Sequence, residues 1–217
     1  MQYEQAPLCT LPAKMSVSGL VHGDSEPILS RPAFLYKEGM TAAERGTAMH
    51  AVLQFADFAA ASKDLAAEME RLIKGGWIER ELARQLETEC MQTFLKSDLA
   101  ARMQNAQTLL REYDFITSVP AKYVDETLPK DFWYQPVMVQ GIADAVIVNG
   151  DTAEIVDYKT DRSKTPAQFL KTYSKQLLLY KAAIEKRLGT AATRCTIYSF
   201  SLGREIDVPI ENKKEKS

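Results

Sequence analysis

The stretch PVMVQGIADAVIVNGDTAEIVDYK, residues 136–159, decides the fold of this chain. Its two halves are rich in β-branched residues and are separated by Asn149-Gly150, and Asn-Gly between two apolar runs is typical of a β-hairpin. A two-residue turn at this dipeptide pairs Asp144 with Ile155. Because side chains alternate along a strand, Asp144, Asp157 and Lys159 then share one face of the sheet. The two aspartates become diagonal neighbours, close enough to share a cation.

The charged groups of this hairpin leave two interpretations open. A turn of odd length would send Asp144 to the other face of the sheet. With the predicted turn, two carboxylates and an ammonium group lie among apolar residues, and burying them costs free energy unless they are paired or bind a metal. An Asp157–Lys159 ion pair at the end of a sheet would satisfy this requirement as well as a metal site would. Asp-x-Lys on its own occurs by chance in many proteins.

The sequence on either side of the hairpin predicts the remaining elements. Thr41 and Glu44 form a capping-box pattern that starts a helix, and further helices are expected at 63–74, 77–90 and 97–104. Thr165-Pro166 opens a helix that should end before Gly189. Strands are expected at 110–120, 193–201 and 204–209. The order of elements predicts an α/β (α+β) fold, in which a central mixed sheet is flanked by helices and preceded by a helical subdomain.

The chain divides into four expected regions within one structural domain. They are an irregular extension at 1–40 with a short helix at 16–21, a helical part at 41–108, a core at 109–210, and a frayed charged tail at 211–217. The composition of 46% hydrophobic and 26% charged residues excludes disorder for the bulk of the chain. No apolar run approaches the ~20 residues that cross a bilayer, so no membrane partner is expected. The three scattered cysteines predict a cytoplasmic protein without a disulfide framework.

The charge distribution is uneven. The net charge of −2 lacks the basic excess of a dedicated nucleic-acid-binding protein. Residues 159–187 nevertheless carry eight basic side chains against two acidic ones, Asp161 and Glu185. Such a run is usually a solvated helix face, and by itself it is only a weak indication of nucleic-acid binding.

Five short motifs lie along the chain in a fixed order. They are ERGTAMH at 44–50, REY at 111–113, GIAD at 141–144, VDYKTD at 156–161 and QLLLY at 176–180. Each alone has an ordinary structural explanation, such as a packed helical histidine for His50 or an edge-strand charge for Glu112. Together they resemble the RecB-type family of PD-(D/E)xK nucleases, with a restriction-endonuclease-like core. The resemblance covers about residues 41–188 and is greatest to the nuclease domain of AddA-type helicase–nucleases.

This resemblance implies a divalent-metal site and a DNA-binding surface. The implied metal ligands are His50, Asp144, Asp157 and the main-chain carbonyl of Tyr158, and Lys159 would orient or deprotonate the attacking water. Supporting or DNA-contacting roles fall to Glu112, Gln176, Tyr180, Arg45, Thr160, Lys171 and Lys175. Carboxylate and carbonyl oxygens suit Mg²⁺, and an imidazole makes Mn²⁺ a suitable substitute. The chain has no C-x-x-C motif, so no iron–sulfur cluster is expected.

The implied function is metal-dependent exonucleolytic hydrolysis of DNA within an AddAB/RecBCD-type complex for double-strand-break repair and recombination. Its partners would be DNA, an AddB-like subunit and the helicase portion of a longer parent polypeptide. One alternative is a stand-alone RecB-like phage or defence nuclease, and another is a catalytically silent DNA- or protein-binding scaffold. Asp144 and Asp157 are expected to stay ionised at neutral pH. His50, with an ordinary pKa of about 6.5, would then make metal binding weaken below pH 6–7.

Overall fold

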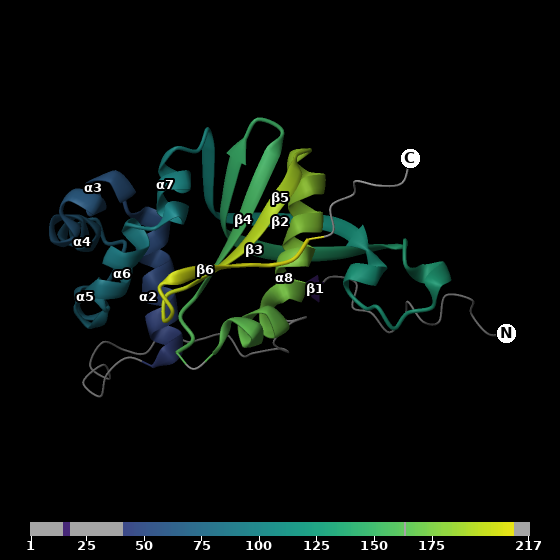
Figure 1. Cartoon of the computed structure of the whole chain (residues 1–217), viewed down its shortest axis with the longest axis horizontal. Coiled ribbons are helices and arrows are strands. Elements are labelled where there is room, and N and C mark those ends of the chain that lie inside the picture. The colour runs from purple at the N-terminus through teal and green to yellow at the C-terminus, as the bar shows by residue number, and fades with distance from the viewer. Residues whose placement is uncertain (1–14, 18–40, 163, 211–217) are drawn as a thin grey trace.

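A six-stranded mixed sheet forms the centre of the computed structural model, which describes residues 15–17, 41–162 and 164–210 (Figure 1). Its strands are β1 (Met15–Ser16), β2 (Thr108–Pro120), β3 (Pro136–Asn149), β4 (Thr152–Lys159), β5 (Ala191–Ser199) and β6 (Arg204–Asp207). The order is β1-β3-β4-β5-β6, and β2 pairs with β3 off this path. The β2–β3, β3–β4 and β5–β6 pairs are antiparallel, whereas β1–β3 and β4–β5 are parallel.

Helices cover both faces of this sheet. One group comprises α2 (Ala42–Phe55), α3 (Phe58–Lys63), α4 (Leu65–Lys74), α5 (Arg80–Gln85), α6 (Thr88–Leu95) and α7 (Asp98–Gln104). The long α8 (Pro166–Leu188) connects β4 to β5 and packs on the other face, apart from the first group (Figure 1). Two 3₁₀ turns, η3 (Ala121–Tyr123) and η4 (Lys130–Phe132), lie between β2 and β3. The predicted α/β fold is confirmed. None of the helices in the described ranges is long and apolar enough to cross a bilayer.

The sheet separates two hydrophobic cores. Side chains such as Ile155 pack with Leu177 and Ile184 of α8 in one core, whereas Val156 packs with Leu53 in the other, together with the helices before the sheet. Consecutive β4 residues therefore face opposite cores, which explains why β4 is buried along nearly its whole length. This double coverage buries β4, and with it the charged side chain of Asp157.

The hairpin turn lies one residue later than the sequence predicted. Asn149 pairs with Thr152, so the loop is Gly150-Asp151, and Gly150 has φ +57°. Only the first loop position requires a positive φ, which glycine adopts without strain. Asn149 remains in the strand, where its side-chain oxygen accepts a hydrogen bond from the Gln107 backbone N–H at 2.9 Å.

This shift changes the register without changing the faces. The last pair of the β3–β4 ladder is Ala145 with Val156. Continuing this register by one residue places Asp144 opposite Asp157 and not opposite Ile155. Because Ile155 and Asp157 lie on the same face of β4, Asp144 and Asp157 still share a face. The predicted pairing was wrong, but the two aspartates are still neighbours across the hairpin. They lie directly opposite each other, whereas the sequence had predicted a diagonal arrangement.

Some predicted helix boundaries were also wrong. The helix expected at 77–90 is divided into α5 and α6, because the buried Leu86 adopts an extended backbone conformation. The helix expected at 63–74 begins at Leu65, with the Asp64 side chain capping it by accepting from the Ala67 N–H. Ser16 belongs to β1 and pairs with Gln140, and the first helical residue is Val17, one position after the expected start of the short helix. The rest of that helix and the tail at 211–217 lie outside the described residues.

Candidate metal centre and nuclease site

Three predicted site residues from three elements meet beside the sheet. His50 comes from α2, Glu112 from β2 and Asp144 from β3, and one ligand atom of each lies within 4.8 Å of the other two. The His50 Nδ1 atom is 3.3 Å from Glu112 Oε1 and 3.5 Å from Asp144 Oδ1. Glu112 was predicted to be a supporting residue, and its carboxylate lies as near to the histidine as that of Asp144. The group offers one imidazole nitrogen and two carboxylates, a donor set that fits a hard divalent cation.

Glu112 reaches this position through an unusual backbone conformation. Its φ of +47° is the only positive value among the non-glycine residues that the structure describes. Such a conformation costs on the order of 1–3 kcal/mol and persists only where surrounding contacts enforce it. Glu112 lies between the pairs Arg111–Ala145 and Tyr113–Ala143 of the β2–β3 ladder, and therefore opposite Asp144. The strained residue directs its carboxylate towards His50.

The neighbouring Arg111 fixes helix α2 against the same strand. Its guanidinium donates to the main-chain oxygens of Gln54 and Ala56, at 3.2 and 2.6 Å, and lies 4.1 Å from the centre of the Phe58 ring. Burial lowers the pKa of this arginine. Because these contacts hold the C-terminal end of α2, they also fix the helix that carries His50.

Asp157 lies at the adjoining end of β4 and is 1% exposed. Its Oδ2 atom is 2.7 Å from the Lys159 ammonium, and its Oδ1 accepts a hydrogen bond from Gln176 Nε2 at 3.3 Å. The same Gln176 nitrogen donates to the Tyr180 hydroxyl at 2.9 Å. The structure therefore brings the predicted Gln176 and Tyr180 together on one face of α8 beneath Asp157.

Asp144 links the two groups of residues. Its Oδ2 accepts a hydrogen bond of 2.6 Å from the backbone N–H of Tyr158, between Asp157 and Lys159. The Tyr158 side chain is buried and its ring makes an edge contact with the His50 ring. The main-chain carbonyl of Tyr158 as a metal ligand stays a prediction.

The electrostatics of the site differ from the sequence-based expectation. Burial and the nearby charge of Asp157 raise the pKa of Asp144 to about 7, so this carboxyl is not fully ionised at neutral pH. Burial alone would lower the pKa of His50, but the charges of Asp144, Glu112 and Asp157 together raise it to about 9. The expected ionisation of Asp144 and the ordinary histidine pKa were both wrong, because a sequence does not show how closely the carboxylates are packed.

Lys159 remains charged in this setting. Its burial would lower the pKa of the ammonium group, but Asp157 and Asp144 outweigh this effect and raise that pKa above its ordinary value. A positively charged lysine donates hydrogen bonds and does not take up a proton.

Tyr173 is a site residue that the sequence reasoning missed. The Lys159 ammonium lies 4.5 Å from the centre of its ring, and the Tyr173 hydroxyl donates to Asp161 Oδ2 at 2.8 Å. Lys164 donates to the same hydroxyl at 2.9 Å. The spacing in the sequence could have identified it, because Tyr173 lies three residues before Gln176 and therefore on the same face of the helix.

We expect the Tyr173 ring to position Lys159. Tyr173→Leu removes the cation–π contact, which contributes roughly 0.5–2 kcal/mol, and should slow DNA cleavage by about 3- to 30-fold without changing the KM for DNA. Tyr173→Phe keeps the ring and should retain most of the rate. Steady-state kinetics on a fluorescent oligonucleotide measure both. Equal losses in the two variants would assign the effect to the hydroxyl network instead of the ring.

Gly141 is required for packing behind the site. A Cβ atom at this position would lie 2.8 Å from Phe115 Cζ and 3.0 Å from Tyr180 Cε1. Gly141→Ala should therefore displace the Tyr180 ring and destabilise the fold by about 1–3 kcal/mol. Thermal unfolding followed by circular dichroism measures the change. An unchanged melting temperature would mean that the two rings move aside freely.

The predicted DNA-contacting residues do not form one cluster. Arg45 and Thr160 line the same hollow near the site. Lys171 and Lys175 are exposed on α8, and the Lys175 ammonium donates to the Val124 carbonyl at 2.8 Å. Their contacts with DNA stay predictions.

The residues His50, Glu112 and Asp144, the candidate metal-ligand group, open onto the surface. The hollow above it has about 710 Å³ of free volume, including the part open to solvent, and its lining includes Gly46, Thr47, His50 and Glu112. A phosphodiester strand could therefore approach the carboxylates from outside. An imidazole, a cluster of carboxylates, a neighbouring lysine and an open approach are the groups that metal-assisted hydrolysis of a phosphodiester requires.

Comparison with known proteins agrees with this class of site. The sequence matches the PD-(D/E)XK nuclease superfamily over residues 28–215, and the chain belongs to this superfamily. The predicted restriction-endonuclease-like core is thereby confirmed. Among curated relatives, an ATP-dependent helicase/nuclease subunit from Anoxybacillus flavithermus is 34% identical over 91% of this chain and 17% of its own length. The corresponding protein from Clostridium perfringens is 32% identical over 86% of this chain and 16% of its own length. The chain thus spans less than a fifth of these relatives.

Proposed function

We propose that this chain is a divalent-metal-dependent deoxyribonuclease domain that degrades DNA from strand ends. The observation that supports this most directly is the convergence of His50, Glu112 and Asp144 next to the buried Asp157–Lys159 pair. Sequence similarity to helicase/nuclease proteins and membership of the nuclease superfamily point the same way. A silent scaffold is disfavoured, because each charged group that hydrolysis needs is present and within reach of the next.

The metal that fits the donor set is Mg²⁺, with Mn²⁺ as a substitute. His50, Glu112, Asp144 and Asp157 would hold it, together with the Tyr158 carbonyl. When bound, the ion lowers the pKa of a coordinated water and neutralises charge that develops on the phosphate. His50 must lose its proton to bind a metal, and the partly protonated Asp144 must ionise.

The remaining residues would orient the attacking water and the metal ligands and would stabilise negative charge on the phosphate. Lys159 stays protonated, so it would donate a hydrogen bond that orients the attacking water and would stabilise negative charge on the phosphate. Gln176 keeps Asp157 in place through the hydrogen bond described above, and Tyr180 in turn accepts from Gln176. Lys171 and Lys175 would contact the phosphate backbone further from the reaction.

We also propose the wider setting in which the domain works. It would form part of an AddA-type helicase–nuclease in the cytoplasm, and together with an AddB-like partner it would act in double-strand-break repair. The helicase portion of the same polypeptide would deliver the DNA, which is consistent with the net charge of −2 on this domain.

A nuclease assay with matched metal controls tests the proposal. Purified protein is incubated with linear and circular single-stranded DNA in Mg²⁺, in Mn²⁺ and in EDTA, alongside Asp144→Asn. Degradation of linear DNA alone, with metal and by the wild type only, is the expected result. Cleavage in EDTA would exclude the metal mechanism, and cleavage of circles would exclude strict exonuclease action. No cleavage under any of these conditions would overturn the proposed function.

A further inference from the structure

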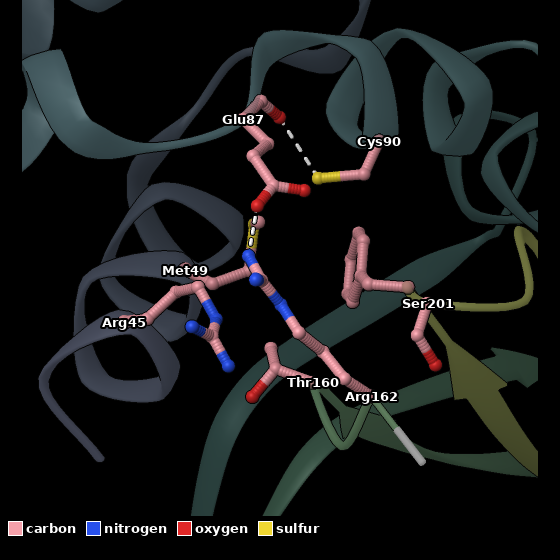
Figure 2. A pocket seen from close by; sticks show the side chains of 8 residues that line it. Arg45, Met49, Glu87, Cys90, Thr160, Arg162 and Ser201 are labelled. Carbon is pink, nitrogen blue, oxygen red and sulfur yellow. Dashed lines mark hydrogen bonds and ion pairs between the residues drawn. The ribbon is translucent and has the colours of Figure 1, made fainter. Parts of the chain in front are cut away.

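A second hollow lies beside the metal-ligand group and is lined by two arginines (Figure 2). Its lining includes Arg45 from the first turn of α2, Thr160 and Arg162 from the segment after β4, and Glu87 and Cys90 from the region of α6. The free volume is about 320 Å³, including the part open to solvent.

The position of this hollow relates it directly to the reaction site. Arg45 is followed in α2 by Gly46, which lines the hollow above His50 and Glu112. Thr160 directly follows Lys159, and its hydroxyl oxygen lies 3.5 Å from where a Cβ on Gly46 would be. The two hollows therefore adjoin at the start of α2, and one extended strand of DNA could occupy both.

The donors of the second hollow suit a phosphate group. Within the described part of the chain, neither the Arg45 guanidinium nor the Thr160 hydroxyl has a hydrogen-bond partner. Figure 2 shows the Arg45 and Arg162 side chains extending into the same space, with Thr160 below them. Two guanidinium groups with planar donor sets and one hydroxyl are typical of phosphate recognition.

Resting on the proposed function, we propose that this hollow binds the DNA phosphate next to the one that is hydrolysed. Arg45, Arg162 and Thr160 donate hydrogen bonds to its oxygens and fix the register of the strand over the metal centre. This gives Arg162 a binding role. Among the residues that line this hollow, the sequence motifs had implied a DNA contact only for Arg45 and Thr160.

The Arg162 side chain is paired with Glu87 in the structure. The Arg162 guanidinium forms an ion pair with the Glu87 carboxylate, and both side chains are more than half exposed, at 58% and 59%. Exposed ion pairs contribute little to stability, so a phosphate can replace this carboxylate. Because Glu87 also carries a negative charge next to the hollow, it opposes phosphate binding, and removing that charge should strengthen the binding of DNA.

Opposite effects of neighbouring variants test the proposal. Binding of a fluorescent single-stranded 12-mer is measured by anisotropy in EDTA at several salt concentrations. The double variant Arg45→Gln/Arg162→Gln should weaken binding about tenfold and reduce the slope of log K against log salt by about 0.7 for each lost phosphate contact. Glu87→Gln should tighten binding several-fold. Arg84→Gln, which removes an exposed arginine paired with Glu81 in α5, is the matched control and should change little.

A comparison of 12-mers with and without a terminal phosphate shows whether the hollow binds an internal phosphate of the strand or the phosphate at its end. A loss shared by both probes identifies an internal phosphate, as proposed, whereas a loss confined to the phosphorylated probe assigns the hollow to strand ends and overturns that part. If the wild type cleaves DNA and the double variant binds no more weakly than Arg84→Gln, the second site is refuted and the nuclease function stands. If Glu87→Gln weakens binding, the role of Glu87 as a competitor is refuted.

Discussion

Lys159→Ala is expected to reduce DNA cleavage by at least about a thousandfold, equivalent to roughly 4 kcal/mol of transition-state stabilisation. The ammonium group lies between the Asp157 carboxylate and the Tyr173 ring, and no other described side chain forms an ion pair with that carboxylate. Water that enters the space would not supply that charge. Single-turnover cleavage of a labelled oligonucleotide at saturating Mg²⁺ measures the loss.

Folding must be separated from chemistry in this experiment. Removing Lys159 leaves the buried Asp157 without its ion pair, which destabilises the protein. Circular dichroism and thermal unfolding of the variant should still show a cooperative native state, and Asp157→Asn, which preserves side-chain size, should lose cleavage to a similar degree. Lys63→Ala, an exposed lysine at the end of α3, is the control and should cleave normally. Cleavage by Lys159→Ala within tenfold of wild type would refute the assignment.

Metal affinity is expected to rise steeply with pH up to about pH 9. The pKa of His50 is raised to about 9 and that of Asp144 to about 7, so at neutral pH the metal-free site holds one proton on the histidine and a fraction of one on the carboxyl. A cation must displace these protons. Binding should therefore release close to two protons below pH 7 and about one between pH 7 and 9. Each displaced proton weakens the apparent affinity about tenfold for every pH unit below the corresponding pKa.

Calorimetric titration of Mn²⁺ in buffers with different ionisation enthalpies counts the released protons. His50→Ala should release about one proton fewer. The dependence that remains should follow Asp144, whose pKa rises further once the positive charge of the histidine is gone. The variant should also lose more affinity for Mn²⁺ than for Mg²⁺, because imidazole favours the softer ion. Equal proton release by wild type and variant would show that His50 does not bind the metal.

The hairpin illustrates how far the sequence determined this site. Alternation and parity were sufficient to place Asp144 and Asp157 on one face, even though the turn was assigned one residue too early. The positive φ falls at Gly150, and Gln107, more than 40 residues earlier in the chain, forms hydrogen bonds with both Asn149 and Gly150 at this turn. Long-range contacts of this kind are not encoded in local patterns.

The ionisation states were less predictable than the positions of the residues. Helical spacing placed Gln176 and Tyr180 on one face, and in the structure Gln176 donates hydrogen bonds to both Asp157 and Tyr180. The separation of His50 from Glu112 and Asp144 depends on how α2 packs on the sheet, and Arg111 sets that packing through contacts that span more than 50 residues. The raised pKa values follow from this packing, so no local motif could have shown them.

The strained backbone at Glu112 has an evolutionary consequence. Glycine adopts a φ of +47° without the cost that a side chain imposes, so Glu112→Gly would relax the strand while it discards the carboxylate. Selection for stability and selection for catalysis thus act in opposite directions at this single codon. In a lineage that no longer needs to cut DNA, Glu112→Gly would stabilise the fold at once. Loss of Lys159 or Asp157 would instead destabilise it, because each leaves the charge of the other residue unpaired. Decay of the enzyme into an inert fold would therefore begin at Glu112 and reach the central pair last.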